Sequence, residues 1–429
     1  MIKFVLLFLT FIMLVGCGSS SSGEVVEEEA LPEPHGKSSI PMLVLLVSYN
    51  DIKVSSSESV WGAKLFGKNQ HELNHYYIEV SNSNFEFSRA AENDGVADDG
   101  IVSVELDKNH PDTDINSVDF AANVYPDLKA ALVAVDAEVD FSNYDGDANG
   151  YISPDELLLT FIIAGYEDAY AGYHVSKGIW AHQYCMTSAA NVPVLDGVGL
   201  MDCYNEGNFA LFGERHDNTP SRTHDATIGI IAHELGHSAF SLPDLYNTSA
   251  STGGIGYFGL MGAGTWSIQN SSEYYGNTPT HFSAWSKLYN GWITPVEGQG
   301  YLSLFETSSA DYNVLKIPID SSSYYLLENR NNSGYDKGLY SLTGDFNGGM
   351  ALWHINESKL TNYYIASNTV NADTNNKGVD LVEAVYGTID SDGSGGDESA
   401  LFYYGNVDSF ETLVSDVSAR GSQMTLNIN

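Results

Sequence analysis

The stretch Ile230-Ile-Ala-His233-Glu234-Leu-Gly-His237 says more about the fold than any other part of the chain. Residues four apart share one face of a helix, so a helix here presents both imidazoles to a single metal ion. Glu234 lies beside them, placed to take a proton from metal-bound water. The apolar residues around the motif predict a helix over 228–239. The alternative is an amphipathic helix whose His and Glu side chains are solvated.

A third ligand is expected soon after this helix, because a catalytic zinc site takes three protein ligands and keeps one position open. Pro243 cannot lie inside a helix, so the chain should turn before it and could bring Asp244 back to the metal. Glu273 is a more distant carboxylate that ranks behind Asp244. A Gly-rich turn carrying Met261 follows.

These segments together resemble one protein family. The block from His233 to Asn247, followed by Leu260-Met261-Gly262 and Trp266, resembles the immune inhibitor A-like (M6) secreted metallopeptidases, which are zinc proteases of the metzincin type. Further segments resemble the same family in the same order, and the likeness covers roughly residues 41 to 429. These segments are 178–182, 279–292, 325–330 and 349–355.

The resemblance implies a site and a fold. It implies that His233, His237 and Asp244 are zinc ligands. It also implies that Glu234 is the general base and that Met261 lies in a Met-turn beneath the metal. The implied fold class is α+β, with a metzincin-like catalytic domain of a mixed sheet and an active-site helix, followed by a β-rich part.

The chain departs from the metzincin pattern at one point. That pattern has a glycine three residues after the second histidine and the third ligand three residues further on. Here Phe240 and Pro243 occupy those positions, and Asp244 comes one residue late. The departure concerns the third ligand and leaves the two histidines and the glutamate unaffected.

The patterning of the whole chain predicts an α/β part followed by a mostly β part. Continuous apolar runs at 41–48 and 157–164 predict buried strands, and 121–139 has helical spacing. After about Trp292 short apolar or alternating runs are separated by Gly, Asn, Asp and Ser, which is typical of β structure. We expect a catalytic domain over 41–296 and a β-rich portion of the same family domain over 297–429.

The N-terminus predicts export. Residues 1–16 have a positive end and a short apolar run, as in a signal peptide. They end at Leu14-Val15-Gly16-Cys17, which resembles the lipobox of bacterial lipoproteins and implies that Cys17 carries a lipid anchor. Residues 17–40 then form an acidic linker containing Ser and Pro. We expect an exported lipoprotein of the bacterial cell envelope, held at a membrane by its lipid or released to the medium.

The two other cysteines, Cys185 and Cys203, are expected to form a disulfide, because an exported chain passes through an oxidising compartment. The alternative is a pair of buried free thiols.

Residues 145–156 match the EF-hand calcium loop. Oxygen side chains stand at the ligand positions, Tyr151 would add its backbone carbonyl, and the segment after the loop reads as a strand. We therefore expect a structural Ca²⁺ site rather than a helix–loop–helix switch; the alternative is an acidic turn without metal. The side-chain ligands would be Asp145, Asp147, Asn149 and Glu156. The acidic segment 390–398 follows no strict template, and a solvated loop is the better interpretation there.

The charge of the chain limits its partners. It has 56 Asp and Glu against 18 Lys and Arg, a net charge of −38. This composition lacks the basic footprint that nucleic acids require, and it argues against docking on anionic lipid.

The leading hypothesis is a zinc-dependent endopeptidase that cleaves proteins or peptides outside the cell, with Zn²⁺ and Ca²⁺ as its metals and a monomer as its state. The rival hypothesis is a catalytically inactive, metallopeptidase-like surface lipoprotein used for binding or adhesion. A carbohydrate-binding β module at the C-terminal end could coexist with the protease.

Overall fold

The computed structural model describes residues 36–113, 120–247, 253–389 and 395–429. The expected signal peptide, the lipidation site Cys17 and most of the linker lie outside these ranges, so export and lipid anchorage stay predictions. The first residues of the acidic segment 390–398 also lie outside them. Within the described ranges, no helix combines the length and the apolar character needed to cross a membrane.

The strand β1 (Ser39–Tyr49) is the centre of the largest sheet, and both of its faces are buried. The continuous apolar run predicted such a strand, because a parallel strand covered on both faces needs apolar side chains at successive positions. Alternate side chains of β1 enter two different cores. Those on one face are Ile40, Met42, Val44 and Leu46, and those on the other are Leu43, Leu45, Val47 and Tyr49.

This sheet has eight strands in the order β10-β9-β4-β1-β2, with β3 also paired to β1, β5 to β4 and β6 to β9. The pairs are parallel, except that β6 and β10 run antiparallel to β9. The sheet is therefore mixed, as expected. Its other strands are β2 (Glu86–Arg89), β3 (Ile101–Leu106), β4 (Leu158–Glu167), β5 (Gly178–Ile179), β6 (His182–Tyr184), β9 (Phe209–His216) and β10 (His224–Asp225).

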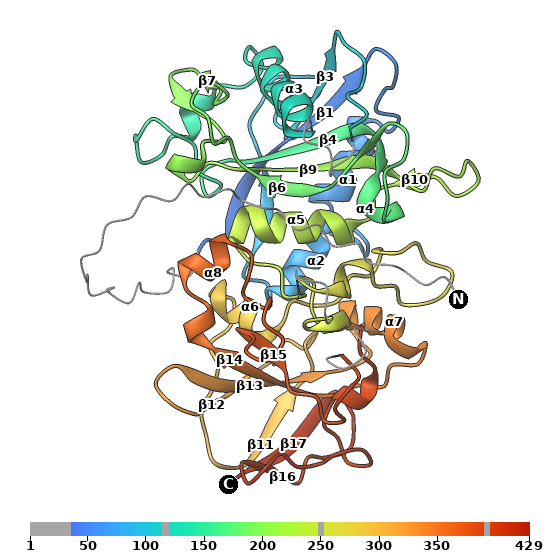
Figure 1. The fold of residues 1–429 in the computed structure, drawn as a ribbon, viewed down its shortest axis with the longest axis vertical. Coiled ribbons are helices and arrows are strands. Elements are labelled where there is room, and N and C mark those ends of the chain that lie inside the picture. Colours follow the sequence, from blue (N-terminus) through green and yellow to red (C-terminus); the bar gives the residue numbers. More distant parts are fainter. Residues whose placement is uncertain (1–35, 114–119, 248–252, 390–394) are drawn as a thin grey trace.

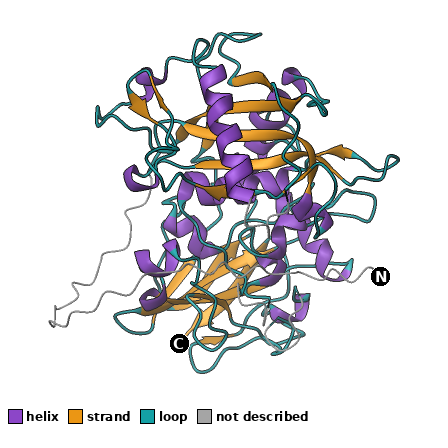
Figure 2. Cartoon of the chain, turned by 45° about the horizontal axis from the view of Figure 1, so that its top comes forward, coloured by secondary structure: helices purple, strands orange, loops and turns teal. Residues whose placement is uncertain are grey.

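Helices cover both faces of this sheet (Figures 1 and 2). The helices α1 (Glu58–Phe66), α2 (Leu73–Val80) and α5 (Ile228–Phe240) pack in one core, while α3 (Phe120–Ala134) packs in the other. The short helix α4 (Asp168–Ala171) follows β4. In Figure 1 α5 lies between the sheet and the C-terminal part of the chain.

The C-terminal part is rich in β structure, as its short apolar and alternating runs predicted. One sheet has the order β12-β13-β14-β15 and another the order β11-β17-β16, and all their pairs are antiparallel. The strands are β11 (Gly300–Phe305), β12 (Leu315–Pro318), β13 (Ser323–Arg330), β14 (Gly349–Asn356), β15 (Val379–Leu381), β16 (Val414–Ser415) and β17 (Gln423–Ile428). The helices are α6 (Ala284–Tyr289), α7 (Tyr340–Thr343) and α8 (Asn362–Ala366).

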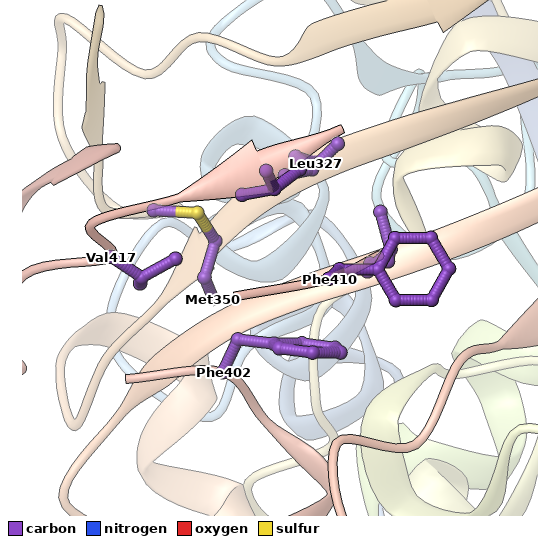
Figure 3. Close-up of a pocket in the computed structure, with 7 residues that line it drawn as sticks. Leu327, Met350, Phe402, Phe410 and Val417 are labelled. Carbon is purple, nitrogen blue, oxygen red and sulfur yellow. The ribbon is translucent and has the colours of Figure 1, made fainter. Parts of the chain in front are cut away.

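A third core lies between these two C-terminal sheets. It holds a cavity of about 10 Å³ (Figure 3), lined by Leu327, Met350, Leu352, Phe402, Phe410, Val414 and Val417. A cavity of this size with only apolar walls is a packing defect rather than a binding site.

The two parts of the chain share a core. The core cluster that contains α5 also contains side chains of the C-terminal part, among them Tyr324, Leu326, Trp353 and Leu381. The catalytic and β-rich portions therefore pack as one body, which agrees with the expected α+β fold.

A buried network of charged groups joins the two parts. Arg330 of β13 donates to both oxygens of Asp336, at 2.5 and 2.6 Å, and to the carbonyl oxygen of Phe258, at 2.6 Å. Lys287 of α6 lies 3.9 Å from Glu328, whose other oxygen is 3.3 Å from Arg330. All four charged side chains are buried, so each depends on its partners for compensation.

A disulfide closes the segment between β6 and β9. It joins Cys185 to Cys203, as expected for an exported chain. The segment holds the hairpin of β7 (Val194–Leu195) and β8 (Val198–Gly199). Backbone hydrogen bonds between Met186 and the 201–203 region run beside the disulfide.

We predict that Arg330→Met lowers the free energy of unfolding by about 3–5 kcal/mol, because it leaves the Asp336 carboxylate buried without its partner. Chemical denaturation followed by tryptophan fluorescence measures the change. The control is Lys53→Met, which removes an exposed pair with Glu105 and should cost less than about 1 kcal/mol. Equal losses in the two variants would contradict the importance of the buried network.

We also predict that Cys185→Ser combined with Cys203→Ser lowers the free energy of unfolding by about 2–4 kcal/mol, since the disulfide restrains the unfolded chain. Denaturation of the wild type with and without reductant provides the control. Reductant should destabilise the wild type by a similar amount and leave the double variant unchanged. A wild type that is insensitive to reductant would argue against this stabilisation.

Candidate metal centre

The helix α5 carries the motif and is almost completely buried. Its apolar residues enter the shared core, and it ends at Ser241, which adopts the left-handed conformation with φ 53° before Pro243. His233 is 7% exposed and Glu234 is 5% exposed. The alternative of a helix with a solvated His and Glu is therefore wrong, since both side chains lie inside the molecule.

The turn after α5 brings Asp244 back to the two histidines. The Nε2 atoms of His233 and His237 are 3.2 Å apart. The Oδ1 atom of Asp244 lies 3.1 Å from Nε2 of His233 and 3.4 Å from Nε2 of His237. Three ligand atoms from the residues singled out in the sequence thus form a triangle with nearly equal sides.

This triangle fits a tetrahedral metal ion. Ligands about 2.0–2.1 Å from Zn²⁺ in tetrahedral geometry lie about 3.3–3.4 Å from one another. The three measured separations, 3.1, 3.2 and 3.4 Å, agree with such an edge. Oδ1 of Asp244 is also buried and has no hydrogen-bond partner, although a buried carboxylate oxygen needs a positive or donating neighbour. A cation between the three atoms would supply it.

Backbone carbonyls orient both imidazoles. Nδ1 of His233 lies 3.0 Å from the carbonyl oxygen of Leu260, and Nδ1 of His237 lies 2.5 Å from that of Leu242. The hydroxyl of Thr265 lies 3.0 Å from Nδ1 of His233 and donates to Leu260 at 2.8 Å. Because the Nδ1 atoms carry the protons in these contacts, the Nε2 lone pairs face the triangle.

The turn carrying Met261 lies directly against α5. A Cβ atom on Gly236 would come within 2.8 Å of Sδ of Met261, so a larger residue there would force the methionine side chain to move. The carbonyl oxygen of Met261 accepts a hydrogen bond of 2.7 Å from the backbone of Leu245. The methionine turn thus contacts both the helix with the histidines and the segment with the third ligand.

Asp244 is held by a residue from the C-terminal part. Its backbone N–H donates to Oδ1 of Asn368 at 2.8 Å, and its Oδ2 accepts from Nδ2 of Asn368 at 2.5 Å. The phenol of Tyr246 also hydrogen-bonds to the Asp244 carboxylate. Oδ1 is left to face the histidines.

Glu234 lies beside the triangle in a low-dielectric setting. Burial raises the pKa of Glu234 above its ordinary value, while the imidazoles of His233 and His237 oppose that rise. The backbone of Gln183 in the edge strand β6 also opposes the rise, because its N–H favours the charged form of the Glu234 carboxylate. A carboxylate with a raised pKa accepts a proton more readily near neutral pH.

The electrostatics of the triangle favour positive charge. Burial lowers the pKa of His237, but the carboxylates of Asp244 and Glu234 outweigh burial and raise it to about 9. Burial would raise the pKa of Asp244, yet the two imidazoles hold it well below its usual range. The group thus attracts a proton or, in its place, a metal cation.

The other candidates from the sequence lie elsewhere. Glu273 receives hydrogen bonds from Gln269 and Thr278 and is not in the ligand triangle. Nδ1 of His182 lies 2.8 Å from the carbonyl oxygen of Trp180, and Nε2 lies 3.3 Å from the Tyr125 hydroxyl, so this histidine is hydrogen-bonded outside the triangle.

Residues 145–156 form the second group of potential ligands. Carboxylate oxygens of Asp145, Asp147 and Glu156 lie within 4.8 Å of one another. The strand β4 begins directly after this loop, as expected. Gly150 and Ile152 exchange backbone hydrogen bonds with Gly199 of β8, each 2.9 Å long, so the loop is tied to the hairpin inside the disulfide.

Sequence reasoning missed three residues near the metal centre, namely Asn368, Thr265 and Gln183. None carries a sequence signal, because each acts through a contact formed only in the folded chain. Asn368 is 124 positions away from Asp244.

Comparison with known protein families identifies the family of the chain. The family model described as the immune inhibitor A peptidase M6 catalytic domain matches residues 44–293, more than half of the chain. A search of curated proteins gives no match.

Among solved structures, the chain is similar to wild-type OgpA from Akkermansia muciniphila in two crystal forms. The identity is 13% in both, the match covers 79% of this chain and 88% or 89% of OgpA, and the TM-scores are 0.27 and 0.29. A catalytically inactive OgpA in complex with an O-glycopeptide (glycodrosocin) substrate gives 13% identity, coverage of 79% and 88%, and a TM-score of 0.28. These TM-scores are low, so the assignment rests on the family model: the chain belongs to the immune inhibitor A (M6) family of metallopeptidases.

Proposed function

We propose that the protein is a zinc-dependent endopeptidase that hydrolyses peptide bonds of extracellular proteins. The observation that carries this proposal is the buried triangle of two imidazole nitrogens and one carboxylate oxygen beside a buried glutamate. Its donor set suits Zn²⁺, which binds His nitrogen and Asp oxygen in catalytic sites with three protein ligands. When bound, zinc lowers the pKa of a water molecule and polarises a carbonyl group.

Glu234 is the general base in this proposal. Its carboxylate lies next to the ligand triangle, and burial keeps its pKa above the ordinary value. It would accept the proton of the attacking water and then deliver it to the amine of the leaving peptide.

The rival hypothesis, a non-catalytic binding or adhesion protein, gains no specific support from the site. Such a protein has no need of a buried glutamate with a raised pKa beside its metal ligands. Only the endopeptidase hypothesis predicts cleavage of a protein substrate, so a proteolysis assay separates the two hypotheses.

We predict that the zinc-loaded protein digests casein, that a zinc chelator stops digestion, and that zinc restores it. The variant Glu234→Gln should retain zinc, because its ligands are intact, but lose at least about 10²–10⁴-fold in kcat through loss of the base. Zinc content is measured by elemental mass spectrometry and cleavage by release of labelled fragments.

The matched control for this experiment is Glu273→Gln, which changes a carboxylate outside the triangle and should keep both zinc and activity. Undiminished proteolysis by Glu234→Gln would remove Glu234 as the base. Stoichiometric zinc in a wild-type protein that cleaves no protein substrate would favour the rival hypothesis.

We also propose that residues 145–156 hold a structural Ca²⁺ ion. The support is the clustering of the three carboxylates at EF-hand ligand positions, with the oxygens of Asn149 and Tyr151 in the same loop. Its role would be to fix the loop against β8 and thereby the hairpin inside the disulfide.

We predict that added Ca²⁺ raises the Tm of the zinc-loaded wild type, since a ligand that binds only the folded state stabilises it by mass action. Glu156→Gln removes the closing carboxylate and should abolish the shift in differential scanning calorimetry. Asp155→Asn removes one charge at a non-ligand position of the same loop and should keep the shift. A wild type whose Tm does not respond to Ca²⁺ would contradict a calcium site.

A further inference from the structure

We propose that Asn368, in the C-terminal part, is a positioning residue of the metal centre: it aims the Asp244 carboxylate at the two histidines. The inference rests on the proposed zinc site and extends it to a residue outside the range of 44–293 that the family model matches.

Asn368 holds Asp244 through two hydrogen bonds. The side-chain oxygen of Asn368 accepts from the backbone N–H of Asp244 at 2.8 Å, and its side-chain nitrogen donates to Oδ2 of Asp244 at 2.5 Å. Two bonds to one amide fix both the backbone and the carboxylate of Asp244. The bond to Oδ2 is charge-assisted, which makes it stronger than a bond between neutral groups.

These two hydrogen bonds determine which oxygen of the Asp244 carboxylate faces the histidines. Asn368 engages Oδ2, so Oδ1 is the oxygen that faces the histidines and completes the triangle. Without the amide, the carboxylate could rotate about its terminal torsion and offer either oxygen or neither. The expected consequence is weaker metal binding, because the ligand would no longer be held in position before the ion arrives.

The backbone around Asn368 holds the amide in place. Asn368 follows α8 and adopts the left-handed conformation, with φ 52°, which asparagine tolerates better than most residues. Its N–H donates to the carbonyl oxygen of Ile365 at 3.0 Å, and the next N–H donates to that of Tyr364 at 2.9 Å. These bonds end the helix and point the side chain at Asp244.

A second asparagine ties the same segments together. Asn371 is 1% exposed and donates to the carbonyl oxygens of Leu245 and Val379, at 2.9 and 2.7 Å. Its own side-chain oxygen accepts from the backbone of Gly378 and Val379. The segment with the third ligand is therefore hydrogen-bonded, through Asn371, to β15 of the C-terminal sheet.

The test compares three variants. Asn368→Gly removes the side chain and tolerates the left-handed backbone. Asn368→Asp keeps the shape and the acceptor but replaces the donor to Oδ2 with a carboxylate oxygen. Asn82→Gly is the matched control, since Asn82 also has a left-handed backbone, with φ 53°, and lies in the turn after α2.

We predict that both Asn368 variants bind zinc about 10–100-fold more weakly than the wild type, as is typical when an outer partner of a metal ligand is lost. Competition with a chromogenic chelator measures the zinc affinity, and the visible absorption of the cobalt(II)-loaded proteins reports the ligand geometry. The metal-free variants should melt within a few degrees of the metal-free wild type. Asn82→Gly should match the wild type in zinc affinity and in cobalt spectrum.

Wild-type zinc affinity and an unchanged cobalt spectrum in Asn368→Gly would overturn the inference while leaving the zinc proposal intact. A large fall in the Tm of the metal-free Asn368 variants, without a change in zinc affinity, would also overturn it, because the role would then be structural. A wild type that binds no zinc would refute the zinc site itself and this inference with it.

Discussion

One carboxylate, buried beside the buried His233 and the partly buried His237, is the constraint on which this structure depends. A buried charge is costly unless partners compensate it, and Oδ1 of Asp244 has only the face of the two histidines available. A cation at one point would compensate this oxygen, and the neighbouring groups hold three potential ligand atoms around that point. The carbonyls that accept from the histidines and the amide that holds Asp244 all serve this geometry.

The supports of that centre come from both the part of the chain that carries α5 and the C-terminal part. The carbonyl oxygen of Leu260 faces His233, while the N–H of the same residue donates to the carbonyl oxygen of His281 at 3.1 Å. Two residues earlier, the carbonyl oxygen of Phe258 accepts from the buried Arg330. The methionine turn is thus fixed between the helix of the catalytic part and a charged network of the C-terminal part.

Local sequence patterns were enough to predict much of the fold and the three residues of the ligand triangle. The i, i+4 spacing in α5, the apolar run of β1 with two buried faces and the alternation along the C-terminal strand β17 are properties of single segments, and the structure has each of them. The ligand triangle was within reach because its three residues span only twelve positions. Asn368 and Arg330 were out of reach, because an asparagine or arginine in a polar loop or strand gives no sign of the partner it meets after folding.

The late position of Asp244 relative to the metzincin spacing is best understood through these distant contacts. A ligand one residue further along the chain enters the site from a longer turn, which by itself constrains the carboxylate less. The turn is held instead from outside, by Met261 through Leu245 on one side and by Asn368 and Asn371 on the other. The departure from the family spacing lengthens the turn before Asp244. The contacts from the C-terminal part then hold this longer turn in place. In the proposed zinc site, the C-terminal part of this chain therefore helps to present the third ligand.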